Sequence, residues 1–223
     1  MITRSAAAIA LILAPAAFSQ TYVVPTGDCG SVTFNVTRGA GTIVADQVSS
    51  ARVYLPHERL AAKLAEGPRS LTFNANVPDK AVVMAAVDLK PQVVGNETRT
   101  EHAKAFIFCG ATPMADWQRT ADMGLDIIPQ GWNGPRPKMK AGDSMRFIAV
   151  DPAAKHVLWD VPMELRRADG RVVATGTPDR YSGMDFSYPE PGRYVVVATY
   201  RRADPQKPDH WLVDTSTLTF DVK

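Results

Sequence analysis

Alternation of apolar and polar residues with a period of two recurs along most of this chain. The segment 32–36 carries Val32, Phe34 and Val36 on one side, and the segments 71–77, 161–165 and 218–222 repeat the pattern. Successive side chains of a strand point to opposite faces, so the pattern predicts strands with one buried face. Antiparallel sheets are the usual setting for such strands. We therefore predict an all-β protein built from antiparallel β-sandwiches.

Turn residues separate these segments. Ala168-Asp169-Gly170 lies between two strand-like segments and predicts a hairpin in which glycine takes a positive φ. The chain has 17 prolines, many of them at such boundaries, which favours short strands over long helices. The segment 56–66 is different, because it begins with proline, carries Leu60 and Leu64 four residues apart and ends before Gly67-Pro68. We predict a surface helix there.

The length of 223 residues favours more than one domain, since single domains most often have about 100–150 residues. We divide the chain into a signal peptide (1–19), an N-terminal β-sandwich domain (20–115) and a C-terminal immunoglobulin-like or transthyretin-like sandwich (140–223). The segment 116–139 is a linker, or its residues 125–128 form the first strand of the second domain. Near the C-terminus, Tyr194 follows an acidic-x-Gly-x pattern and is predicted to close a tyrosine corner.

The first 19 residues have the layout of a secretory signal. Arg4 supplies a basic head, residues 6–14 are apolar, and small residues follow through Ala17 and Ser19. Cleavage is expected between Ser19 and Gln20, with a cut after Ala16 as the alternative. The apolar run is too short to span a bilayer, and no later stretch is long enough. We predict a secreted, periplasmic protein with no transmembrane segment in the mature chain.

Cysteine use agrees with export. Cys29 and Cys109 are the two cysteines of the chain. In an oxidising compartment an even number of cysteines favours a disulfide, and a loop of this length would stabilise the fold by about 4 kcal/mol. A thiol nucleophile or a copper thiolate stays open as an alternative, but each needs a companion residue that the sequence does not display.

Charge and motifs argue against two large classes of protein. The 25 basic and 23 acidic residues are nearly balanced, so nucleic acid is not an expected partner. The sequence contains no Gly-x-Ser-x-Gly, no His-Glu-x-x-His, no phosphate-binding glycine loop and no Cys-x-x-Cys. We predict that the protein is not an enzyme. A two-carboxylate glycosidase stays open, because its residues can lie far apart in sequence.

The four histidines are the candidate metal ligands, since neutral imidazole is a common donor: His57, His102, His156 and His210. Their spacing matches no compact motif, so the fold would have to assemble any site. His102 stands out because it precedes the apolar segment 105–109 and follows Glu101. On a strand, however, those two side chains point to opposite faces. The four tryptophans offer a sugar-stacking platform as an alternative.

Several segments, in the same order, resemble a family of exported proteins, domain of unknown function family 4198, often described as NikM-like components of nickel or cobalt uptake. They are the segments 100–105, 124–129, 140–143, 168–170, 191–194 and 218–222. The resemblance implies a periplasmic all-β protein that handles a divalent metal. Family members tend to begin the mature chain with a histidine near an aromatic residue, whereas this chain begins Gln20-Thr21-Tyr22. His102 is the family-matching residue that would ligate a metal.

These observations favour a periplasmic ligand-binding accessory protein. Its ligand would be a divalent metal, nickel or cobalt ahead of copper, passed to components of a membrane transporter, with no cofactor required. Two alternatives belong to other classes. One is a structural or protein-interaction module of the cell envelope without metal, and the other is a carbohydrate-binding module.

Overall fold

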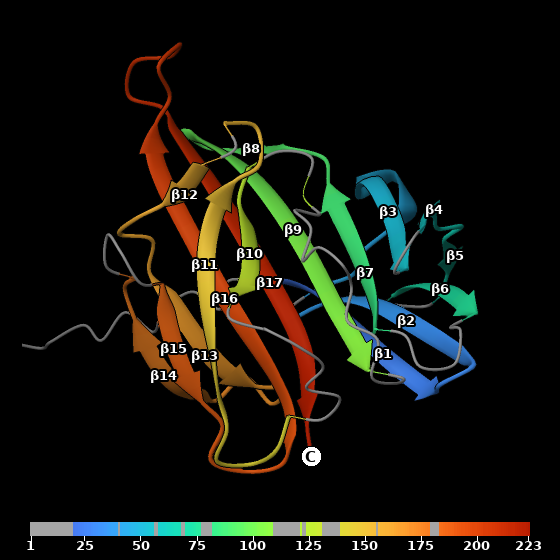
Figure 1. Ribbon diagram of the computed structural model, residues 1–223. Coiled ribbons are helices and arrows are strands. Elements are labelled where there is room, and N and C mark those ends of the chain that lie inside the picture. Colours follow the sequence, from blue (N-terminus) through green and yellow to red (C-terminus); the bar gives the residue numbers. More distant parts are fainter. Residues whose placement is uncertain are drawn as a thin grey trace, which may run out of the picture.

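The computed structural model consists almost entirely of β-strands (Figure 1). It describes residues 20–39, 41–55, 58–67, 70–76, 82–108, 121, 124–130, 139–154, 156–178 and 183–223. Within these ranges the one helical element is a short 3-10 helix, η1 (Ala45–Gln47). The all-β sandwich predicted from the sequence is confirmed. No helix in the described part of the chain has the length and hydropathy needed to cross a membrane.

The largest sheet joins strands from the middle and the end of the chain. Its order is β14 (Val172–Gly176), β13 (Met163–Arg167), β16 (Gly192–Ala203), β17 (Trp211–Val222), β9 (Glu97–Phe108), β7 (Val82–Leu89), β3 (Val48–Leu55) and β4 (Glu58–Ala61), with β8 (Gln92–Val94) also paired to β9. All these ladders are antiparallel except the one between β17 and β9, which is parallel. In Figure 1 the red β17 lies beside the green β9. This sheet crosses the boundary predicted at 116–139, and the division into two domains is not confirmed.

Two smaller sheets complete the architecture. The first is β1 (Thr21–Asp28), β2 (Ser31–Arg38), β6 (Leu71–Asn76) and β5 (Ala65–Glu66). The second is β10 (Asp126–Gln130), β11 (Ser144–Asp151), β12 (His156–Leu158) and β15 (Met184–Ser187). β10 pairs antiparallel with β11, so the segment 125–128 contributes a strand, as one of the two sequence alternatives expected.

The two small sheets pack against opposite faces of the large one, and β7 shows this directly. All eight residues of β7 are buried. Val83, Ala85 and Val87 belong to the hydrophobic core shared with the first small sheet. Met84 and Ala86 belong to the core shared with the second. A strand buried on both faces reads as a continuous apolar run, which explains why β7 lacks the alternation seen elsewhere.

The predicted inward-facing residues of β2 and β17 are buried. Val32, Phe34 and Val36 on β2 have no exposed surface and form part of the first core. On β17, Leu218 and Phe220 are equally buried in the second core, between the large sheet and β11. Period-two alternation therefore identified the correct face of these strands.

The helix predicted for 56–66 is wrong. In its place β4 pairs antiparallel with the edge of β3, and β5 pairs with β6. Leu60 is 42% exposed, so the two leucines do not form a buried helical face. Two apolar residues one turn apart are too few to stabilise a helix by packing, whereas β4 gains backbone hydrogen bonds from β3.

The predicted hairpin turn at 168–170 and the tyrosine corner at Tyr194 are confirmed. Gly170 has a φ of 88° in the turn that links β13 to β14. The Tyr194 hydroxyl donates a hydrogen bond to the Glu190 carbonyl over 2.8 Å, the contact that defines a tyrosine corner. Tyr194 therefore has a structural role, as the sequence indicated.

Tyr188 supplies a prediction about alkaline stability. Its side chain is fully buried, and its hydroxyl has no hydrogen-bond partner among the described residues. Burial raises the pKa of this phenol above the ordinary value. Above pH 10 the unfolded chain loses this proton while the folded chain keeps it, so stability falls as the pH rises.

Tyr188→Phe is expected to be at least as stable as the parent to urea at pH 8, because it removes a buried hydroxyl that has no partner among the described residues. Between pH 8 and pH 11 the free energy of unfolding of the parent should fall by about 1.4 kcal/mol more than that of the variant. This is the effect of one group at one pH unit above its ordinary pKa. Urea denaturation at both pH values measures the difference. An equal alkaline loss in both proteins would contradict the prediction.

Candidate functional site

The structure does not bring the described candidate histidines together. His102 is buried on β9, His156 is exposed on β12, and His210 lies before β17 with its Nε2 2.9 Å from the Thr98 hydroxyl. His57 lies outside the described residues. In the ranges that are described, no group of three or more histidine, cysteine, aspartate or glutamate side chains is placed to hold a metal ion. Metal binding stays a prediction.

Other sequence predictions fall on parts of the chain that the structure does not describe. They include the signal peptide (1–19), Cys109, Trp117 and Trp132. Cys29 lies in the turn between β1 and β2, and its pairing with Cys109 stays a prediction. Of the two described tryptophans, Trp159 is 39% exposed and Trp211 packs under Arg201, 4.0 Å from its guanidinium carbon.

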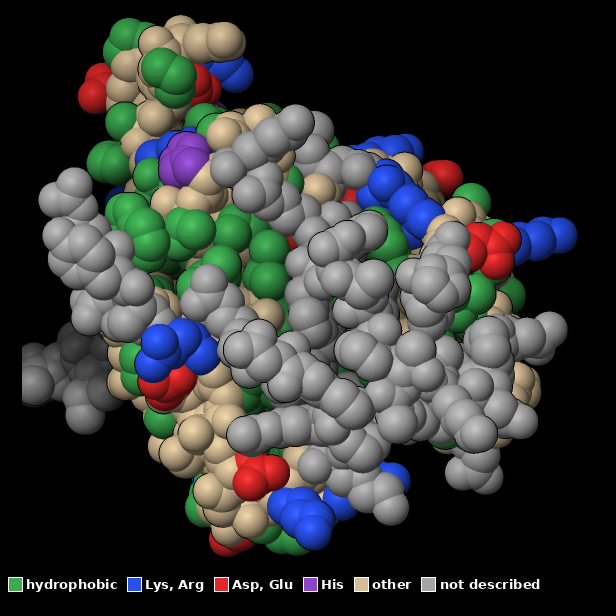
Figure 2. Space-filling model, viewed as in Figure 1, with side chains coloured by type: hydrophobic (Ala, Val, Ile, Leu, Met, Phe, Trp, Pro, Cys, Tyr) green, Lys and Arg blue, Asp and Glu red, His purple; other side chains and the backbone are tan. Residues whose placement is uncertain are grey.

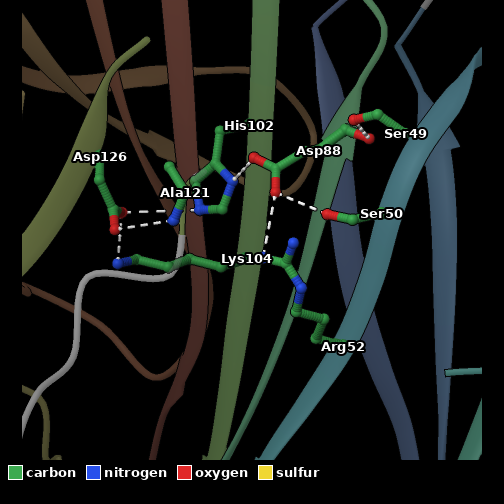
Figure 3. Close-up of polar contacts among 8 residues, drawn as sticks. All are labelled: Ser49, Ser50, Arg52, Asp88, His102, Lys104, Ala121 and Asp126. Atoms are coloured by element: carbon green, nitrogen blue, oxygen red, sulfur yellow. Dashed lines mark hydrogen bonds and ion pairs between the residues drawn. The ribbon is translucent and has the colours of Figure 1, made fainter. Parts of the chain in front are cut away.

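His102 belongs instead to a buried charge cluster formed by Asp88, His102, Lys104 and Asp126 (Figure 3). β7 carries Asp88, β9 carries His102 and Lys104 two residues apart on one face, and β10 carries Asp126. The His102 Nδ1 lies 2.7 Å from Asp88 Oδ1, and the Lys104 Nζ lies 2.6 Å from Asp126 Oδ1. None of the four residues is more than 3% exposed.

Further contacts balance the charges of this cluster. Ser50 donates a hydrogen bond to Asp88 Oδ2 over 2.8 Å, and an Arg52 nitrogen lies 3.6 Å from the same oxygen. The backbone N–H of Ala121 donates to Asp126 Oδ2 over 3.2 Å. The His102 Nε2 lies 3.6 Å from Asp126 Oδ1, so the imidazole ring lies between two carboxylates. Two aspartates face a lysine and an arginine, which compensates the charge.

The cluster ties β10 to the large sheet. Burial lowers the pKa of the Lys104 ammonium below its ordinary value, and the nearby Asp126 carboxylate opposes that shift. None of the four side chains lines either of the two cavities described below. The buried charge cluster therefore lies apart from both of these cavities. Sequence reasoning found His102 but missed its partners, although a charged residue at an inward position of an apolar strand, such as Lys104, is the signal that marks them.

A polar groove of about 600 Å³ lies on the other face of β9. Because successive residues of a strand alternate, Glu97, Arg99 and Glu101 point into it from β9 while His102 and Lys104 point away. The remaining charged lining comes from β2, β13 and β16: Arg38, Glu164, Arg166 and Arg201. We call this cavity the arginine groove.

Most charges in the arginine groove are already paired. The Glu97 carboxylate accepts a hydrogen bond from Arg99 over 2.7 Å and lies 3.5 Å from an Arg201 nitrogen. Glu164 accepts from the Arg166 Nε over 2.7 Å. Such pairs hold the side chains in place along the groove without closing it.

Arg38 is the exception. Its side chain is only 10% exposed, yet its one contact with an acceptor in the described chain is a 3.4 Å approach of a terminal nitrogen to Glu101. Its Nε is buried with no partner among the described residues. Glu101 is itself held by the Thr21 backbone N–H over 3.2 Å and the Thr21 hydroxyl over 2.5 Å. A guanidinium has five N–H donors, so most of those on Arg38 are unused.

A second pocket of about 430 Å³ shares Arg166 with the arginine groove. Its other arginines are occupied. Arg193 donates to Asp221 over 2.8 Å and to the Pro25 carbonyl over 3.0 Å, and Arg167 donates to the Tyr194 hydroxyl over 3.0 Å. The arginine groove therefore offers more unused donors than this pocket.

Charges elsewhere on the surface form local pairs. On the face drawn in Figure 2, blue Lys or Arg side chains lie beside red Asp or Glu side chains at several places. One pair links β11 to β15, with an Arg146 nitrogen 2.6 Å from an Asp185 oxygen. Both side chains are well exposed, and exposed pairs contribute about 0–1 kcal/mol. The buried Arg38 is in a different environment.

Together, the sheets and the groove define an all-β sandwich protein with a charged cavity on one sheet face. No protein-family model matches the chain, and the search of curated proteins found no match. Among solved structures, it is similar to the Yersinia pseudotuberculosis adhesin InvE, with 13% identity, 90% of this chain covered and a TM-score of 0.25. The chain spans 58% of the length of that adhesin chain. It is also similar to a chimeric titin Z1Z2 functionalized with a KLER exogenous peptide from decorin, with 10% identity and a TM-score of 0.23. That match covers 92% of this chain and 94% of the titin chain. Neither similarity bears on function.

Proposed function

We propose that this chain is an exported ligand-binding protein whose ligand lies in the arginine groove and carries an anionic group. The observation that supports this proposal most is Arg38, a nearly buried guanidinium with unused donors at the wall of a cavity. The layout of residues 1–19 supports export. Delivery to a membrane transporter is part of the proposal.

The physical argument rests on the cost of an unpaired buried donor. Leaving such a group without a partner costs about 1–3 kcal/mol, and more when the group is charged. A carboxylate satisfies two guanidinium donors at once in a planar, bidentate contact. The groove volume of about 600 Å³ lies within the range of small-molecule sites. A ligand carboxylate in the groove would therefore accept charge-assisted hydrogen bonds from the terminal nitrogens of Arg38.

Arg38→Ala is expected to weaken ligand binding by about 10- to 100-fold, because it removes a charge-assisted hydrogen-bonding group. Titration calorimetry on the mature protein would use acetate, succinate, glutamate and the dipeptide Ala-Ala as probes, with glucose as an uncharged comparison. We expect at least one carboxylate to bind with a Kd below about 1 mM.

Arg171→Ala is the matched control. Arg171 is 64% exposed in its side chain and lines neither cavity. This variant loses the same charge and should bind like the parent. Absence of carboxylate binding, or an equal loss in both variants, would contradict the proposal. Nickel or cobalt handling stays a separate prediction, since the charged lining of the groove consists of arginine and glutamate.

A further inference from the structure

We infer that the ligand of the arginine groove is a zwitterion, with a carboxylate and an ammonium group, as in an amino acid or a short peptide. This inference rests on the proposed function and narrows its ligand class. Two observations support it. The groove contains both signs of charge, and two of its charged side chains have donor or acceptor atoms without a partner among the described residues.

The groove lining combines both signs of charge. Among the described residues, four arginines and three glutamates line it. Three glutamates in the lining would weaken the binding of a simple anion, because their carboxylates and the ligand carry like charges. A ligand that carries both signs has a favourable partner for each. The lining therefore fits a zwitterion better than an anion.

Among the three glutamates of the groove, Glu164 has the most unused hydrogen-bond acceptor capacity. Its side chain is 37% exposed, against 20% for Glu97 and 22% for Glu101. Both contacts with Arg166 use its Oε2, and no contact within the described residues uses its Oε1. Glu97 is shared by two arginines, and Glu101 is held by Thr21. An ammonium group, with three N–H donors, would find its acceptor at Glu164.

The two unused groups come from different sheets. Arg38 ends β2 in the first small sheet, and Glu164 lies on β13 in the large sheet. A ligand whose carboxylate binds Arg38 and whose ammonium binds Glu164 bridges the walls of the groove. Neutral polar residues also line the groove and provide hydrogen-bonding groups for a peptide backbone: Gln20, Gln92, Thr100, Thr199 and Thr215.

The test uses three forms of one dipeptide on the full mature protein: Ala-Ala, N-acetyl-Ala-Ala without the ammonium, and Ala-Ala-amide without the carboxylate. Calorimetry should show that each blocked form binds at least tenfold more weakly than Ala-Ala. Glu164→Gln should weaken Ala-Ala about tenfold and leave N-acetyl-Ala-Ala unchanged. Arg38→Ala should weaken Ala-Ala and leave Ala-Ala-amide unchanged.

Glu190→Gln is the matched control for Glu164→Gln, because Glu190 is 61% exposed and lines neither cavity. Circular dichroism and the Tm establish that each variant is folded. One result would overturn the inference of a zwitterionic ligand and leave the proposed function intact. In it, Ala-Ala and N-acetyl-Ala-Ala bind the parent equally well, and Arg38→Ala binds neither. Binding of succinate but not of Ala-Ala would do the same. If no carboxylate binds, both proposals fall.

Discussion

Replacing Lys104 with methionine is expected to lower the free energy of unfolding by about 3–5 kcal/mol. Lys104 and Asp126 are both completely buried, with the ammonium nitrogen 2.6 Å from the carboxylate. Methionine preserves most of the side-chain volume but removes the charge, which leaves the buried Asp126 carboxylate without its ammonium partner. Urea denaturation at pH 7, followed by circular dichroism, measures the loss.

The double variant Lys104→Met with Asp126→Leu is the control. It removes both charges, so no buried ion is left unpaired, and it should recover most of the stability lost by the single variant. A loss below about 1 kcal/mol in the single variant would contradict the prediction, because that is the range of exposed pairs. A double variant as unstable as the single one would show that packing, and not charge, sets the effect.

The second large effect is expected for Phe220→Ala, with a loss of about 3–5 kcal/mol. Phe220 has no exposed surface, and its ring centroid lies 5.4 Å from Phe106 and 5.3 Å from Tyr188. Truncation removes aromatic contacts and leaves a cavity between the large sheet and the second small sheet. Chemical denaturation monitored by tryptophan fluorescence gives the change in stability.

Phe73→Ala makes the same change in the other core, where Phe73 stacks on Phe34 with centroids 5.2 Å apart. Since β7 contributes to both cores, we expect each variant to lower the midpoint of one shared transition. Two separate transitions, each affected by only one variant, would contradict this expectation and support the division into two domains.

Local sequence patterns predicted the strands whose two faces differ. Val32, Phe34 and Phe220 were placed correctly, because period-two alternation reports one buried face directly. The same rule gave no signal for β7, which is buried on both faces. The helix predicted for 56–66 failed because pairing of β4 with β3, a tertiary contact, decided the conformation.

The sequence predicted less of the candidate site than of the strands. Arg38, Glu101 and Glu164 are separated by more than sixty residues at each step, so no local spacing connects them. They meet because the parallel ladder between β17 and β9 places the C-terminal strands beside the middle of the chain. That pairing depends on contacts across the whole fold. His102 was singled out as a candidate metal ligand, which stays a prediction, and no local spacing pointed to its contacts with Asp88 and Asp126.

The position of β17 also bears on the order of folding. This strand (Trp211–Val222) comes last among the described strands, yet it lies between β16 and β9 within the large sheet. During synthesis the large sheet is incomplete until β17 has emerged, so a chain that still lacks β17 leaves the facing edges of β9 and β16 unpaired. The two parts of the large sheet on either side of β17 can therefore join only once β17 has paired with both β16 and β9.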